Sequence, residues 1–227
     1  MNKCINRKLN LFNMFLGLKS AQLIARWLIA NKIDITHLLL AQNNIGDEGL
    51  ETMASVLMMK KTIVVVDFSQ NGLTPKSASS IAGILSRSES IVDLNIGSIQ
   101  GSNRNRLCKD GALALAYGIS LNLCVVQILH LRGVQLGNEE VEMFADSLQD
   151  YLYLLHLDLS QNRLEGTRGG AAINRILGRR CKDFGGVDLE HLDLANNKLG
   201  NGGFAAITHH LITNEDYDTL TLNLSNN

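Results

Sequence analysis

The sequence predicts an α/β fold: a curved solenoid with a parallel β-sheet on its concave face and α-helices on its convex face. Two observations support this prediction. The stretch LLHLDLSQNRL at residues 154–164 returns almost letter for letter as LEHLDLANNKL at residues 189–199, and related stretches recur along most of the 227-residue chain. Several of these stretches precede a segment whose apolar residues have helical spacing, so the repeating unit is a strand, a turn and a helix.

The repeated stretch follows the template L-x-x-L-x-L-x-x-N-x-L. Copies include ITHLLLAQNNI at 35–45 and IVVVDFSQNGL at 63–73, and TLTLNLSNN at 219–227 keeps the same register. The positions equivalent to the template Asn are 14, 43, 71, 99, 134, 162, 197 and 227, with spacings of 28 to 30 residues except for two of 35. A period near 28 with two seven-residue insertions indicates a repeat architecture.

Within each copy, alternate side chains face opposite sides of the predicted strand. In the copy at 154–164, Leu157 and Leu159 face the core between sheet and helices, whereas His156 and Asp158 face outward. One repeat cannot bury its apolar face alone, so neighbouring repeats must stack to form a continuous core.

The template Asn is expected to satisfy backbone groups of the turn after each strand, because its amide both donates and accepts hydrogen bonds. Leaving such buried groups unpaired costs roughly 1–3 kcal/mol each. The predicted structural ladder consists of Asn43, Asn71, Asn162, Asn197 and Asn227. Ile99 and Val134 occupy two template positions and cannot form these bonds, which predicts a locally altered turn at both repeats.

The repeats also predict how the chain is divided. Residues 1–34 are expected to form an N-terminal capping or degenerate repeat, with a helix at 19–31 whose Trp27 seals the core. Residues 35–227 contain about six further leucine-containing units, the last one truncated after its strand. That strand would expose core leucines and an unpaired edge, so we expect more chain or another subunit to cover the C-terminal edge.

These residues resemble leucine-rich repeat proteins of the ribonuclease-inhibitor-like subtype, which have strand–helix units of 28 to 29 residues. The resemblance covers nearly the whole chain and implies the curved leucine-rich-repeat solenoid described above. It also implies a function: a protein–protein interaction scaffold that binds a protein partner through its concave sheet and the rim where the strands end. Enzymatic activity, metals and cofactors are not expected.

The composition argues against several other classes of protein. A net charge of −1 offers no basic excess for binding nucleic acid or a membrane surface. The four cysteines are scattered and form no CxxC pair, which favours free thiols in a reducing, intracellular setting such as the cytoplasm. The glycine-rich stretches at 166–170 and 199–203 lack the Lys-Ser/Thr of a phosphate-binding loop and fit turns before helices.

Outward positions of neighbouring strands form two columns of polar side chains. Parallel strands lie about 4.8 Å apart, so histidines and aspartates gather on the concave face. The residues predicted to contact a partner there are His130, Arg132, His156, Asp158, His191 and Asp193. A metal site or an acid–base constellation is the alternative, and we set it aside because zinc requires a tight tetrahedral ligand set that a gently curved sheet does not supply.

The two insertions are predicted to lie on opposite rims. Residues 97–111 follow a strand and carry Arg104 and Arg106, the candidates for a basic contact with the partner. Residues 178–188 follow a helix, where Arg179 and Arg180 suit the dipole of its C-terminal end. Phe184, in the same insertion, is a candidate anchor if it is exposed.

Two other functions stay open. The unit length and the polar loop in an early repeat resemble the Ran GTPase-activating proteins, in which a loop after an early strand carries a functional arginine. Arg104 or Arg106 lies near that place, although the register differs by about one residue and the acidic tail typical of that family is absent. The other alternative is a structural subunit of a large cytoskeletal or ciliary assembly.

Overall fold

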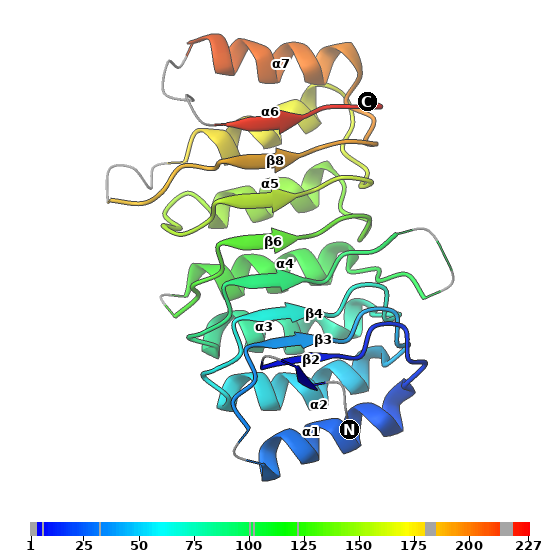
Figure 1. Ribbon diagram of the computed structural model, residues 1–227. Helices are drawn as coiled ribbons and strands as arrows, with labels where there is room; N and C mark the ends of the chain where they lie inside the picture. Colours follow the sequence, from blue (N-terminus) through cyan, green and yellow to red (C-terminus); the bar gives the residue numbers. More distant parts are fainter. Residues whose placement is uncertain are drawn as a thin grey trace.

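The computed structural model describes residues 4–5, 7–31, 33–99, 101, 103–121, 123–179, 185–213 and 220–227. Within these residues, nine strands form one sheet, and their order in space is their order in the sequence (Figure 1). The first strand pair is antiparallel and every later pair is parallel. A sheet in which each strand pairs only with its sequence neighbours is the arrangement of a solenoid.

The strands are short and share one register. They are β1 (Cys4–Ile5), β2 (Lys8–Asn10), β3 (His37–Leu39), β4 (Val65–Asp67), β5 (Asp93–Asn95), β6 (Ile128–His130), β7 (His156–Asp158), β8 (His191–Asp193) and β9 (Thr221–Asn223). Equivalent template positions pair with each other: Leu157 pairs with Leu192, and Leu192 pairs with Leu222. The repeat period in the sequence therefore sets the register of the sheet.

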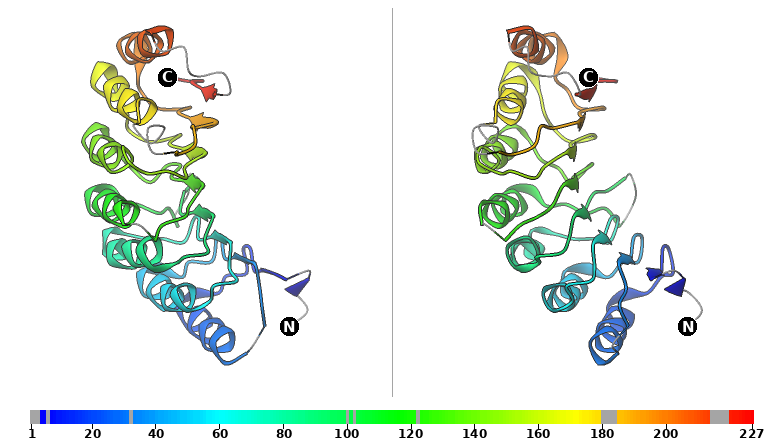
Figure 2. Two further views of the ribbon diagram at one scale, coloured as in Figure 1. Left: turned by 90° about the vertical axis from the view of Figure 1, so that its left-hand side faces the viewer. Right: turned by 60° about the vertical axis from the view of Figure 1, so that its left-hand side comes forward.

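A helix follows each strand from β2 to β8. The helices are α1 (Gly17–Ala30), α2 (Gly46–Met59), α3 (Ala78–Arg87), α4 (Cys108–Ser120), α5 (Asn138–Ser147), α6 (Gly166–Leu177) and α7 (Gly200–Thr213), and a 3-10 helix, η1 (Pro75–Ser77), precedes α3. Figure 2 shows the helices along the outer side of an arc and the strands along its inner side. Helices are about 10 Å wide and strands lie only about 4.8 Å apart, so stacking bends the molecule toward the sheet. The predicted α/β solenoid is confirmed.

Aliphatic side chains fill the space between the sheet and the helices. On α2, Leu50, Met53 and Leu57 are buried, at the spacing of one helical face. The buried residues form one cluster that extends along the whole arc, and Phe68 and Phe144 are its largest fully buried side chains. Each repeat is thus stabilised mainly by the repeats on either side of it.

The turns after most strands use backbone conformations that most side chains avoid. Gln42, Gln70 and Gln161 have φ angles of 59°, 55° and 56°, in the left-handed region. At the start of α2 and α6, Gly46 and Gly166 have φ angles of 66° and 58°, which glycine adopts readily. The same unfavourable turn recurs in successive repeats, so strong local partners must hold it.

Asparagine side chains are those partners. Asn43 is fully buried, its Nδ2 donates to the carbonyl oxygen of Leu40, and its Oδ1 accepts from the backbone N–H of Met14 at 2.9 Å. The backbone N–H of Asn43 donates in turn to Oδ1 of Asn71 at 3.0 Å, which joins neighbouring repeats. Equivalent bonds to the backbone are made by Asn71, Asn162, Asn197 and Asn227.

The ladder does not break at Ile99, contrary to our expectation, because the insertion supplies another asparagine. Asn105 is fully buried, and its Oδ1 accepts from the backbone N–H groups of Asn71 and Leu73 at 2.9 and 3.0 Å. Its Nδ2 donates to the carbonyl oxygens of Phe68, Ile96 and Gly97. Ile99 lies at the edge of the inserted loop and is 46% exposed. The turn is altered there by the extra residues, while its hydrogen bonding is preserved.

Val134 leaves a real gap in the ladder, and two other groups fill it. The backbone N–H of Asn105 donates to Oγ of Ser98 at 2.9 Å, where the template would supply an asparagine oxygen. The backbone N–H of Leu107 donates to the carbonyl oxygen of Val134 at 3.0 Å. The Val134 side chain is fully buried and adds to the core. The backbone N–H groups of Asn105 and Leu107 therefore keep hydrogen-bond partners although no asparagine occupies position 134.

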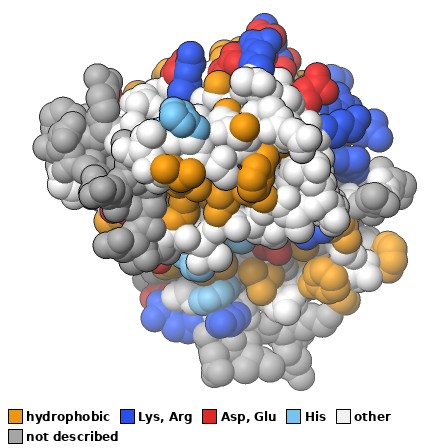
Figure 3. All heavy atoms as spheres, turned by 90° about the horizontal axis from the view of Figure 1, so that it is seen from above, with side chains coloured by type: hydrophobic (Ala, Val, Ile, Leu, Met, Phe, Trp, Pro, Cys, Tyr) orange, Lys and Arg blue, Asp and Glu red, His pale blue; other side chains and the backbone are white. Residues whose placement is uncertain are grey.

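The two ends of the arc differ. At the N-terminal end, β1 pairs antiparallel with β2 along the outer edge of the sheet, and Trp27 of α1 is half-buried against the core. At the other end, β9 has no strand on its outer side among the described residues. Leu222 and Leu224 are only half-buried there, and hydrophobic side chains gather in the middle of this end face (Figure 3).

The substitution Asn105→Ala tests the role of the inserted asparagine. It removes the partners of two buried N–H groups and three carbonyl oxygens at once, and each buried polar group left unpaired costs roughly 1–3 kcal/mol. We therefore expect the free energy of unfolding to fall by about 3 kcal/mol, measured by urea denaturation. Asn162→Ala is expected to have a similar effect.

Asn227→Ala is the matched control. Asn227 makes the same kind of bonds but is exposed on the end face, where water can replace its amide. Its loss should therefore cost well under half as much. Equal costs for Asn105→Ala and Asn227→Ala would contradict the idea that buried backbone groups depend on Asn105.

Candidate partner-binding site

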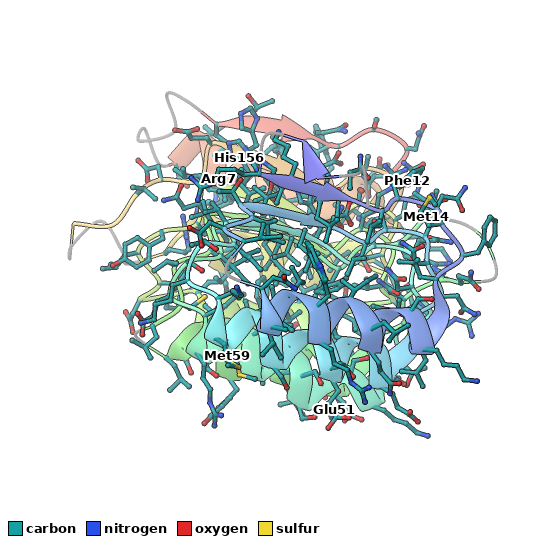
Figure 4. All side chains as sticks on the ribbon, turned by 60° about the horizontal axis from the view of Figure 1, so that its bottom comes forward. Arg7, Phe12, Met14, Glu51, Met59 and His156 are labelled. Carbon is teal, nitrogen blue, oxygen red and sulfur yellow. The ribbon has the colours of Figure 1, made fainter. Side chains whose placement is uncertain are left out.

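The first and third residues of the strands carry the outward side chains of the concave face. Because the strands pair in register, His156 on β7 lies beside His191 on β8, and Asp158 lies beside Asp193. The imidazole rings of the two histidines are 4.3 Å apart between centroids and meet at 81°. Figure 4 shows His156 among the strands, on the opposite side of the sheet from Glu51 and Met59 of α2.

A polar hollow of about 300 Å³ lies where β4 to β7 run into their turns. Three of the predicted contact residues, His130, Arg132 and Asp158, line it. The other lining residues are Gln42, Ser69, Gln70, Asn95, Gly97, Ser98 and Ile99. The hollow is open to solvent, and nearly all of its side chains can donate or accept a hydrogen bond.

Arg132 is the most unusual of these residues. It is half-buried, and its Nε is shielded from solvent without a hydrogen-bond acceptor in the described part of the chain. A buried donor without a partner costs roughly 1–3 kcal/mol. Arginine in general binds a carboxylate or another oxyanion well, because its planar guanidinium offers several parallel donors.

Asp158 and Asp193 have a structural task in addition to their position on the concave face. Oδ1 of Asp158 accepts from the backbone N–H of Ser160 at 2.9 Å, and Oδ1 of Asp193 accepts from that of Ala195 at 2.8 Å. Asn95 makes the same bond to Gly97. One carboxylate oxygen of each aspartate is therefore used in the turn.

His130, which lines the hollow, lies close to the half-buried Asp93 of the neighbouring strand. Nε2 of His130 on β6 is 3.6 Å from Oδ1 of Asp93 on β5. Burial raises the pKa of the Asp93 carboxyl above its usual value of 3.8, and the charge of His130 opposes this effect. The neighbouring carboxylate of Asp67 raises the pKa further. The protein thus keeps a carboxylate where its charged form is disfavoured.

Glu190 adds a carboxylate beside the two histidines. It immediately precedes β8, and its Oε2 is 3.5 Å from Nε2 of His156. Each of His156, Glu190 and His191 offers one ligand atom, and these atoms all lie within 4.8 Å of one another. The strand template did not identify Glu190, because the residue lies just outside the strand whose alternation predicted the other two.

A family model described as "Leucine Rich repeat" matches residues 32–54 and 188–207. The first match contains β3 and the start of α2, and the second contains β8 and the start of α7. These two matches support a leucine-rich repeat protein. No curated protein matches the sequence. Among the residues that the structure describes, no helix is both long enough and apolar enough to cross a bilayer.

The two arginines of the inserted loop have different surroundings. Nε of Arg104 donates to the carbonyl oxygen of Gly133 at 2.8 Å, so Arg104 attaches the loop to the turn after β6. Arg106 is exposed. On the other side of the loop, Oε1 of Gln70 accepts from Oγ of Ser98 and from the backbone N–H of Ile99. Of the two arginines, Arg106 is the better placed to contact a partner.

The second insertion is only partly described. Arg179, which we expected to suit the helix dipole, is buried, and its Nη2 donates to the carbonyl oxygens of Leu154 and Val187 at 3.2 Å. It therefore fastens the connection between α6 and β8 to the preceding repeat. Arg180 and Phe184 lie outside the described residues.

Asp93→Asn tests the electrostatic cost of the concave face. The pKa of Asp93 is raised in the folded state, so ionisation of its carboxyl lowers the free energy of unfolding. This loss of stability is absent below about pH 4 and grows as the pH rises through the folded pKa. The variant should therefore gain stability relative to the wild type between pH 4 and neutrality, measured by denaturant unfolding at several pH values. In a His130→Gln background the gain should be larger, because the charge that opposes burial is gone. If the stability of Asp93→Asn relative to the wild type fell with rising pH, the raised pKa of Asp93 would be contradicted.

Proposed function

We propose that this leucine-rich repeat protein is a non-enzymatic protein–protein interaction scaffold, and that it binds its partner through the concave sheet and the rim where the strands end. The supporting observation is the open polar hollow on this face, which is lined by His130, Arg132 and Asp158. A side chain of a partner could enter this hollow and form hydrogen bonds with these residues. Polar residues held on a rigid scaffold in this way often take part in recognition.

The charges on the concave face indicate the chemistry of the partner. Arg132 favours an acidic side chain, and the partly buried Asp93 beside Asp67 favours a basic one. The two features lie at neighbouring places on one face, so the partner is expected to present residues of both signs. Such complementary charges determine specificity and the rate of association more than affinity.

A protein fits this surface better than a small molecule does. Sites for small ligands are mostly apolar and enclose most of the ligand. The hollow here is polar, open and only about 300 Å³ in volume. A stable protein interface covers about 800 Å² on each partner, which requires several strands of the arc. The hollow is then the place where one partner side chain anchors.

The alternative of a Ran-type GTPase-activating protein depends on Arg106. Arg104 is bonded to Gly133, so the exposed Arg106 is the residue available to reach a bound nucleotide. Stimulated hydrolysis of GTP by Ran that disappears in Arg106→Ala would support this alternative. The alternative of an assembly subunit draws on the outer edge of β9, which pairs with no further strand among the described residues and could receive another subunit.

Affinity capture with matched variants tests the proposed scaffold function. The concave variant combines Arg132→Gln, His156→Ala, Asp158→Asn, His191→Ala and Asp193→Asn. Asparagine keeps the oxygen that holds each turn, as Asn95 already does, so the fold should survive. The convex control combines Glu51→Ala and Met59→Ala, both exposed on α2.

We expect recovery of the wild-type partner to fall by at least about tenfold with the concave variant, because buried charged contacts contribute 2–5 kcal/mol. The convex control should recover the partner normally. Circular dichroism of both variants checks that each is folded. Equal recovery by the wild type and a folded concave variant would exclude the concave face as the binding surface.

A further inference from the structure

We infer that this protein binds a divalent transition-metal ion of the zinc class on its concave face, through His156, Glu190 and His191. Within the described residues, this is the one group of histidine, cysteine, aspartate and glutamate side chains whose ligand atoms converge closely enough to hold an ion. His156 and His191 lie on β7 and β8, and Glu190 immediately precedes β8. The inference reverses our expectation from the sequence that the sheet holds no metal, because Glu190 adds a third ligand that the strand pattern did not include. The inference is independent of the proposed partner, because the ion needs no second protein.

The fold fixes the two histidines relative to each other. His156 and His191 are register partners on adjacent parallel strands, so the strand spacing brings their rings together. The two rings are in edge-to-face contact, with an angle of 81° between their planes. Side chains on strands are held more precisely than side chains on loops.

The third ligand, Glu190, lies at a suitable distance from His156. Nε2 of His156 is 3.5 Å from Oε2 of Glu190. Ligand atoms about 2.1 Å from a tetrahedral zinc ion are about 3.4 Å from one another. The backbone of Glu190 is fixed on both sides: its N–H donates to the carbonyl oxygen of Leu155, and its carbonyl oxygen accepts from the N–H of Thr221.

The ligand set selects the kind of metal. Two imidazoles and one carboxylate suit zinc, cobalt, nickel or copper, whereas calcium and magnesium prefer oxygen ligands only. Asp158 and Asp193 end the same two strands on the same face and add negative charge nearby. Three protein ligands leave one coordination position open, and Glu190 and His191 are exposed, so that position faces solvent on the concave side.

Zinc titration of the metal-free protein by isothermal calorimetry tests the inference. We expect saturable binding of one zinc ion per chain. His156→Ala and His191→Ala should each weaken the affinity at least about tenfold, because even indirect partners of a metal site contribute 10- to 100-fold. His37→Ala is the matched control, since it removes the concave histidine at the first position of β3 and should leave zinc binding unchanged.

Cobalt substitution gives a second readout. A cobalt ion held by two imidazoles and a carboxylate should show the visible absorption of a four- or five-coordinate site without a thiolate charge-transfer band. The visible absorption of the bound cobalt should disappear in His191→Ala, while the melting temperature of the metal-free protein stays unchanged. Absence of saturable zinc binding, a thiolate band, or binding that persists in both histidine variants would overturn the inference.

Discussion

The inward turn after each strand is the constraint on which this molecule depends. The chain must leave the sheet and enter the core with backbone groups that no strand can satisfy. An asparagine amide meets this need because it donates and accepts at the same place, and it also joins one repeat to the next, as Asn43 does with Asn71. The position of every outward side chain on the concave face follows from these turns.

Much of the fold could be predicted from the sequence, because leucine spacing determines both which face of a strand is buried and how strands pair. The position of the first insertion could not. The template placed Ile99 at the ladder position. In the structure the extra residues lie before that position in the chain, so Asn105 occupies the ladder position instead. Any asparagine that a loop returns to the turn can form these bonds, so spacing alone does not identify it.

The candidate site was predicted less completely than the fold, for a related reason. Alternation along strands predicts which side chains face outward, and it correctly places His156 beside His191. It gives no information on residues just outside the strands. Glu190 and the buried Arg179 both lie there, and only the three-dimensional arrangement reveals what they contact. Alternation also does not show that an outward aspartate such as Asp158 uses one oxygen in its turn.

The inserted loop has a mechanical consequence. Repeat proteins are coupled only between neighbours, so a junction with fewer bonds is where the arc would bend or separate first. Val134 creates such a junction in the middle of the molecule. Gln70 holds one side of the loop, and Arg104 holds the other side to Gly133. The loop therefore spans three successive repeats and stiffens the hinge that Val134 would otherwise make, which keeps both halves of the concave surface at a fixed angle.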